Sequence, residues 1–165
     1  MAKTTITGKS TQATTTTATG LGNKLLGKAD RGGVVQAFPF TYTNSTGGTL
    51  ADGSYIQLCT VGPGRVLPTS VFTTTALGSS RVLNIGTQEY VNTAKTTVAA
   101  SANALVAAAD VSSAVVNKTF GAVTTDGAAG AGYDIAGPCD ILAQVTGGTI
   151  PNGAVIRGVI FMVQT

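Results

Sequence analysis

The side chains that usually perform catalysis are scarce in this sequence of 165 residues. It has 7 Asp and Glu, 10 Lys and Arg, and neither His nor Trp. Without histidine the chain lacks the usual general base, the commonest transition-metal ligand and every Ser-His-Asp arrangement. It also contains no Gly-x-Ser-x-Gly elbow, no Cys-x-x-Cys pair and no paired-acid motif. The composition therefore predicts a protein that is not an enzyme and that has no cofactor.

One segment is similar to a phosphate-binding loop. Gly22–Ala29 fits the Gly-x4-Gly-Lys part of that motif, with Lys28 in the lysine position. Ala29 then occupies the place where Ser or Thr must hold magnesium, and no buried strand precedes the segment. We interpret the match as a coincidence in a tail that contains several Gly and Lys residues.

Three acidic residues, Asp126, Asp134 and Asp140, are the candidate ligands for a metal ion. Hard cations such as calcium bind clustered oxygen atoms, and all three residues fall in the last third of the chain. Their spacings of eight and six residues match no calcium-binding loop. We expect solvated loop carboxylates and no metal site.

The two cysteines, Cys59 and Cys139, lie 80 positions apart in predicted strands. Residues 1–20 contain no apolar segment of the kind that a signal peptide needs, so we expect synthesis in a reducing cytosol. The cysteines are therefore predicted to be small buried hydrophobic residues instead of a disulfide. The glycosylation sequons at Asn44 and Asn117 are uninformative for the same reason.

Positive charge is concentrated at the start of the chain. Residues 1–31 carry a net charge of +4, and the remaining 134 residues carry −1. Threonine runs such as Thr14–Thr17 offer little apolar surface, which predicts an extended, Thr-rich basic arm over 1–31 and a single β-sandwich domain over 32–165. The cations are spread too thinly, with too few aromatic residues, to favour nucleic-acid binding. The arm residues expected to contact a partner are Lys3, Lys9, Lys24, Lys28 and Arg31.

The rest of the chain is apolar and poor in charge. Charged residues make up 10% of the sequence, mean hydropathy is +0.30, and there are 22 Gly and 28 Thr residues. No apolar run approaches the ~20 residues of a membrane helix, so no membrane association is expected. Because net charge keeps soluble proteins apart, this composition favours a surface that neighbouring subunits cover.

From Gly32 onward the pattern is one of short strands separated by Gly-rich turns. Pro39 marks the first strand as an edge strand or one with a bulge, and Pro68 interrupts the third. One short helix is predicted over Ser101–Asp110, an Ala-rich segment that Ser101 could cap. The pattern predicts an all-β, jelly-roll-like β-sandwich with one short helix and an extended N-terminal arm. The predicted strands are 34–42, 54–61, 65–75, 81–85, 115–123, 139–146 and 154–164.

The last predicted strand is apolar on both of its faces. Such a strand must lie centrally in a sheet or bury one face against another subunit. The residues predicted to form a subunit interface are Val155, Val159, Phe161 and Val163.

An internal repeat links the two halves of the chain. Thr46–Ile56 recurs at an offset of 100 as Thr146–Ile156, and both copies run from a Gly-Gly pair through an Asp-Gly or Asn-Gly turn into a strand. These dipeptides supply the positive φ angles that tight turns need, so we expect two equivalent corners of a two-sheet fold. A shared ligand site is the alternative, but only Asp52 is ionisable there.

Six segments of turns and strands share a recognisable pattern: Asp52–Leu58, Val61–Ser70, Leu77–Gly86, Ala107–Val111, Asp140–Ala143 and Gly153–Gly158. Through them the sequence resembles, over about residues 48–163, small virion structural proteins of tailed bacteriophages. The resemblance implies a head decoration or cement protein with a jelly-roll-like core, made in the host cytoplasm and located on the capsid surface. Such proteins commonly form trimers and bridge neighbouring subunits of the major capsid protein, and no catalytic residues carry over.

The composition of the chain and its resemblance to phage virion proteins suggest the same mechanism of assembly. We expect the β-core to associate with itself through apolar sheet faces, giving a homo-oligomer, with a trimer favoured. The arm would extend over adjacent capsid subunits, adding backbone hydrogen bonds as an extra strand and lysine contacts to an acidic surface. Each contact would be weak, and repetition over a symmetric shell would supply avidity.

Three alternatives remain open at this point. A phage tail or head-fibre component would share the low charge and the β-rich pattern, although it should show longer repeats. A carbohydrate-binding β-sandwich module would use aromatic residues on one exposed face, and the candidates are Tyr42, Tyr55, Tyr90 and Tyr133. A hydrolase would require acidic residues that converge in a cleft.

Overall fold

The computed structural model describes residues 6–9, 35–45, 49–120 and 132–164, and these form strands, turns and loops with no helix. The first sheet has the order β1-β3-β12-β6-β9 and the second is built on β13, flanked by β2 on one side and by β5 and β4 on the other. A two-stranded hairpin, β7–β8, forms separately. The bounds are β1 Ile6–Lys9, β2 Val35–Thr43, β3 Tyr55–Val61, β4 Gly64–Val66, β5 Val71–Thr74, β6 Val82–Thr87, β7 Tyr90–Val91, β8 Thr97–Val98, β9 Ser101–Asp110, β10 Val115–Thr119, β11 Tyr133–Ile135, β12 Cys139–Thr146 and β13 Val155–Gln164.

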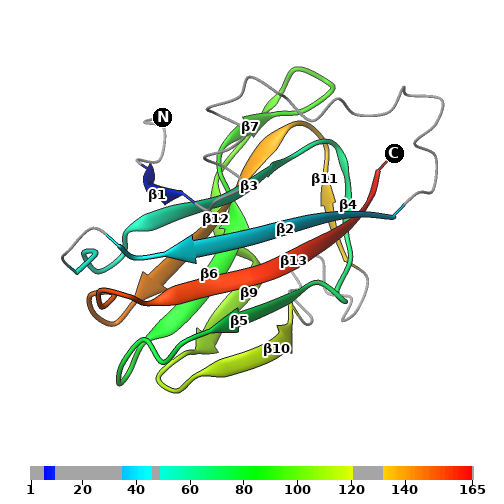
Figure 1. Ribbon diagram of the computed structural model, residues 1–165. Helices are drawn as coiled ribbons and strands as arrows, with labels where there is room; N and C mark the ends of the chain where they lie inside the picture. The colour runs from blue at the N-terminus through cyan, green and yellow to red at the C-terminus, as the bar shows by residue number, and fades with distance from the viewer. Residues whose placement is uncertain (1–5, 10–34, 46–48, 121–131, 165) are drawn as a thin grey trace.

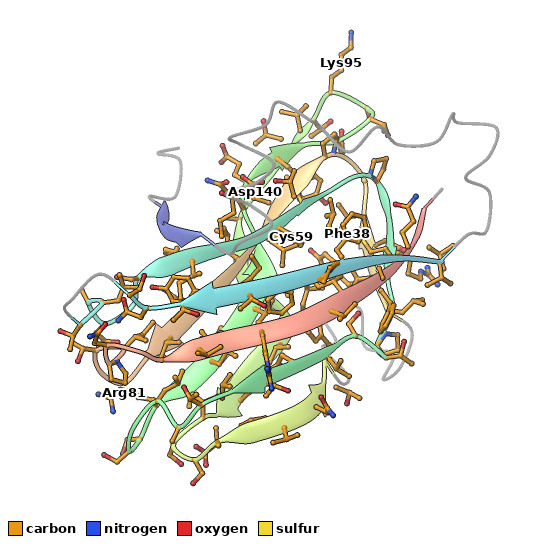
Figure 2. All side chains as sticks on the ribbon, viewed as in Figure 1. Phe38, Cys59, Arg81, Lys95 and Asp140 are labelled. Carbon is orange, nitrogen blue, oxygen red and sulfur yellow. The ribbon has the colours of Figure 1, made fainter. Side chains whose placement is uncertain are left out.

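The strands pair in a nested order. β2 pairs with β13, β3 with β12, β5 with β10, and β6 with β9, all antiparallel. The result is two layers, β2-β13-β5-β10 and β3-β12-β6-β9, as Figure 1 shows with β2 and β13 in front of β6 and β9. This is the topology of a jelly roll, in which a folded ribbon of strand pairs wraps into a sandwich. The predicted jelly-roll-like β-sandwich is confirmed.

The core lies between the two layers and is made of the inward residues of each strand. In β2, Phe38, Phe40 and Tyr42 are buried, and the residues between them are exposed. Phe72 and Phe120 meet edge to face, with ring centroids 6.2 Å apart. Buried and exposed residues alternate in this way when one face of a sheet packs against the core and the other face does not.

The helix predicted over Ser101–Asp110 is wrong, because this segment is strand β9. It pairs antiparallel with β6, and it buries Val106 and Ala109 against the core. The Asn84 side chain accepts a hydrogen bond from the backbone nitrogen of Ala108 (2.8 Å), where φ is positive at 48°. A ten-residue helix is marginal on its own, whereas the open edge of β6 satisfies the backbone groups of β9 and covers its apolar residues. Tertiary pairing therefore overrides the helix propensity of alanine.

The proline positions have the predicted effects. Pro39 lies in β2, which pairs only with β13 among the described strands, so it is an edge strand. The predicted strand 65–75 is divided around Pro68 into β4 and β5, which pair with successive parts of β13. Buried Ser70 holds the bend, because its hydroxyl donates to the Leu67 carbonyl (2.7 Å) and accepts from the backbone nitrogen of Phe161 (2.9 Å).

The repeated segments form two neighbouring corners, one between β2 and β3 and one between β12 and β13. Leu50 and Ile150 pair as an antiparallel bridge, with reciprocal backbone hydrogen bonds of 3.0 and 2.9 Å. Gly53 and Gly153 have matching positive φ angles of 73° and 78°. The buried Asn44 amide donates to the carbonyl of Ile150 at 3.0 Å. The prediction of two equivalent corners is confirmed, and the jelly-roll pairing brings them side by side.

We predict that Gly158→Ala destabilises the fold. Gly158 lies opposite Phe40, whose ring covers it, and an added Cβ would lie 2.7 Å from the tip of that ring and would overlap the backbone oxygen of Val71. The free energy of unfolding should fall by about 1–3 kcal/mol, which urea denaturation would measure. Gly153→Asn is the control, since its Cβ would have open space and Asn tolerates positive φ. Equal stability of Gly158→Ala and the wild type would contradict this packing.

Candidate interaction surface

Outward apolar residues line the outer side of the second sheet, which we call the outer β13 face. Along β13, Ile156, Ile160 and Met162 point into the core, and the residues that alternate with them point outward. The register of β2 and β5 places outward residues of those strands beside them. The outer β13 face comprises Val155, Arg157, Val159, Phe161, Val163, Val35, Ala37, Pro39, Thr41, Thr43, Val71 and Thr73.

Period-two alternation produces this face, since the core accepts only every second side chain of a strand. Val35 keeps 53% of its surface exposed, and Val159 and Phe161 are half-buried by their neighbours within the sheet. The face is therefore a layer of aliphatic and threonine side chains that no other part of the described chain covers. Contiguous apolar surface of this kind is typical of protein interaction sites.

The outer side of the other sheet is polar by contrast. The Thr60 hydroxyl donates to the Asp140 carboxylate at 2.6 Å, and the Gln57 amide nitrogen lies 3.4 Å from the same hydroxyl. Asn84 and Gln144 also point outward there. Among the described residues, the two layers therefore share one core but present different surfaces: the β13 layer presents mostly aliphatic and threonine side chains, and the other layer presents polar ones beside Val82.

The four residues predicted to form a subunit interface all lie on the outer β13 face. Val155, Val159, Phe161 and Val163 are outward and half-buried, in alternation with buried residues. Of the predicted arm residues, Lys9 falls at the end of β1, which pairs parallel with β3. Lys3, Lys24, Lys28 and Arg31 lie outside the described residues.

The charged residues on the outer side of the sheet that contains β13 differ in whether they form ion pairs. Arg65 donates from two nitrogens to the two carboxylate oxygens of Asp134, both at 2.7 Å. The hydrogen bond with Arg65 lowers the pKa of the Asp134 carboxyl below its usual value. The Arg157 side chain makes no ion pair and no hydrogen bond with the described residues. Sequence reasoning did not select Arg157, although its outward position follows from the alternation along β13.

The candidate sites for catalysis or metal binding do not form in the described part of the chain. Asp134 is paired with Arg65, Asp140 with Thr60, and Asp126 lies outside the described residues, as does the segment Gly22–Ala29. No group of three His, Cys, Asp or Glu side chains gathers among the described residues. Tyr42 and Tyr90 are buried in the core, so the four tyrosines share no exposed stacking platform. None of the described residues belongs to a helix that could cross a membrane.

Both cysteines are buried and free. Cys59 and Cys139 lie on the neighbouring strands β3 and β12, where Cys139 is in register with Val61 and Cys59 with Ile141. Burial raises the pKa of both thiols, that of Cys139 to about 12. The prediction of two small buried hydrophobic residues is confirmed.

The similarity of this chain to known proteins lies in its fold. No known protein family matches the sequence, and no curated protein sequence matches it either. A chain in the solved structure of the capsid of Ralstonia phage GP4 has a similar structure, with a TM-score of 0.55 and 23% sequence identity. The alignment covers 82% of this chain and 88% of that chain. The likeness is one of fold. It spans both sheets of the sandwich, since it includes more than four fifths of the residues.

We predict that neither thiol of the folded protein reacts readily with a disulfide reagent at pH 8. Burial shields both sulfur atoms, and a pKa of about 12 in place of 9.0 leaves Cys139 with ~1000-fold less thiolate, which is the reactive form. Reaction should therefore follow unfolding, as measured by the release of thionitrobenzoate with and without urea. Rapid reaction of both thiols without urea would show that the β3–β12 region is open.

Proposed function

We propose that this protein is a non-enzymatic structural protein of a phage virion that decorates and stabilises the capsid. The observation that supports this most directly is a jelly-roll fold, similar to a chain of a phage capsid, with an apolar sheet face that the described residues leave uncovered. The scarcity of titratable side chains agrees with it. The resemblance of residues 48–163 to phage decoration proteins narrows the role to a cement protein.

The outer β13 face is the proposed contact between copies of the chain. Val155, Val159, Phe161 and Val163 would form the apolar centre, and threonines of β2 and β5 would surround it. Removing this surface from water would stabilise an oligomer in proportion to the apolar area covered. A closed ring of three copies satisfies the expectation from the resemblance and leaves the polar sheet facing solvent.

The basic arm is the proposed contact with the major capsid protein. β1 supports this because a short segment near the N-terminus already extends a sheet, pairing with the edge of β3. Extended segments that add to sheet edges gain affinity from backbone hydrogen bonds. The net charge of +4 on residues 1–31 would favour acidic capsid surface, and many weak copies on a shell would act together.

We predict that deletion of residues 2–31 strongly reduces binding to purified capsids. The deletion also removes β1 from the edge of β3, and we expect the sandwich from β2 to β13 to stay folded. Co-sedimentation with capsids would measure binding, and circular dichroism with thermal melting would measure folding. The control replaces Lys3, Lys24, Lys28 and Arg31 with Gln in the full-length chain, which separates the charge of the arm from its length. Full capsid binding by the truncated protein would refute the role of the arm.

We predict that Val159→Lys weakens self-association and that Val82→Lys does not. Both valines are half-buried and point outward, but Val82 lies on β6 in the polar sheet. Sedimentation equilibrium of each variant over a range of concentrations gives the oligomer mass. Because the two substitutions add the same charge, equal dissociation by both would exclude the outer β13 face as the specific interface.

A further inference from the structure

The outer β13 face contains a hollow with an unpaired cation beside it. A hollow of about 300 Å³ opens on this face between β2 and β5, lined by Pro39, Val71, Thr73, Asn117, Arg157 and Val159. A second hollow of about 310 Å³ lies on the other side of Arg157, toward Val155 and Thr75. The guanidinium group therefore stands between two depressions of the proposed interface.

One donor beside this hollow, the Asn117 amide, is held in place by Thr73. The Thr73 hydroxyl donates to the Asn117 side-chain oxygen (3.3 Å) and accepts from the Asn117 backbone nitrogen (3.0 Å). This arrangement leaves the Asn117 amide nitrogen as a donor at the rim. A guanidinium group and an amide beside aliphatic side chains suit a carboxylate, which accepts charge-assisted hydrogen bonds from both.

An unpaired arginine is costly to cover. If a neighbouring copy covers the outer β13 face, Arg157 loses water and needs an acidic partner from that copy. Arg65, the other arginine on this side of the sheet, already has Asp134. It is in register with Val163, six residues from Arg157, or about 20 Å along the strand.

The acidic residues of the described chain differ in their availability. Asp110 accepts a hydrogen bond from the backbone nitrogen of Ser112, Asp134 pairs with Arg65, and Asp140 accepts from Thr60. Glu89 is half-buried, whereas Asp52 is exposed and makes no such bond. Asp52 lies in the turn Ala51–Ser54, which is held by a backbone hydrogen bond of 3.2 Å at the corner between β2 and β3.

We propose that the hollow beside Arg157 receives the carboxylate of Asp52 from a neighbouring copy of the chain. A projecting turn would enter a shallow depression, and its acidic group would meet the unpaired guanidinium. The contact joins different surfaces on the two copies, so it is head-to-tail and generates a closed ring, such as a trimer, when the rotation closes. The inference rests on the proposed function, because it names the residues that join copies through the outer β13 face.

Charge reversal of the full-length protein tests the pair. Arg157→Glu and Asp52→Lys should each weaken self-association about tenfold, because each places like charges together in the contact. The double variant, Asp52→Lys with Arg157→Glu, should recover most of the wild-type association, because each contact again joins opposite charges. Arg65→Glu is the matched control on the same side of the sheet and should have a clearly smaller effect. Sedimentation equilibrium measures association, and thermal melting confirms that each variant is folded.

The outcomes separate this inference from the proposed function. Recovery in the double variant supports the Asp52–Arg157 contact. If the double variant associates as weakly as the single variants, or if Arg65→Glu weakens association equally, the Asp52–Arg157 contact is overturned. The proposal that the protein associates with itself then still stands. A wild-type protein that stays monomeric at all concentrations overturns self-association itself, and with it the proposed role of the outer β13 face.

Discussion

The antiparallel ladder between β2 and β13 is the interaction on which the rest of the structure depends. It joins residues more than 100 positions apart and runs along the whole of β2. Once these two strands are paired, the chain between them must fold back on itself, and the pairs β3–β12, β5–β10 and β6–β9 nest inside. The ladder also places β13 in the middle of its sheet, with β2 on one side and β4 and β5 on the other. Because so much of the pairing is non-local, the entropy of closing the loop must be overcome before most of the contacts form.

This central position explains why the two sheets have different surfaces. β13 is apolar on both sides, and the core can cover only one of them, so Val159 and Phe161 are left on the outside. On the other sheet the outward positions carry polar groups such as Asp140, which accepts a hydrogen bond from Thr60, and Gln144, which donates to the Gly53 carbonyl. The chain has few charged residues, and on the outer β13 face their scarcity leaves a mainly apolar surface. That asymmetry links the fold to the proposed assembly, since a capsid component needs one face that prefers protein to water.

The paired corners connect the core to the proposed contact between copies. The nested topology brings the β2–β3 and β12–β13 connections together, and the bridge between Leu50 and Ile150 joins them. The buried Asn44 amide donates to the carbonyls of Ile150 and Pro151, both at 3.0 Å. A turn held in this way presents Asp52 on an ordered backbone, so that mainly the side chain is ordered at the moment of association. When a charged group is held rigidly, a single ion pair can fix how two copies of the chain align, even where its net contribution to affinity is small.

The sequence did not predict strands β1, β7, β8, β9 and β11. Period-two alternation, proline positions and Gly-containing turns were enough to predict the main strands of both sheets, an edge or bulged position for β2, and the matching corners. These features are local, because each depends on the geometry of a few adjacent residues. The segment Ser101–Asp110 shows the limit: its alanines favour a helix locally, and only the open edge of β6 makes it a strand. Arg157 shows the same limit of prediction from sequence. Its type and outward position are written in the sequence, but its lack of a partner, and the availability of Asp52, depend on which side chains the fold brings together. The sequence by itself thus determined most of the long strands and the apolar excess. The tertiary structure decided which face the described residues leave uncovered and which of their charges they leave unpaired, because burial and pairing are properties of contacts between distant residues.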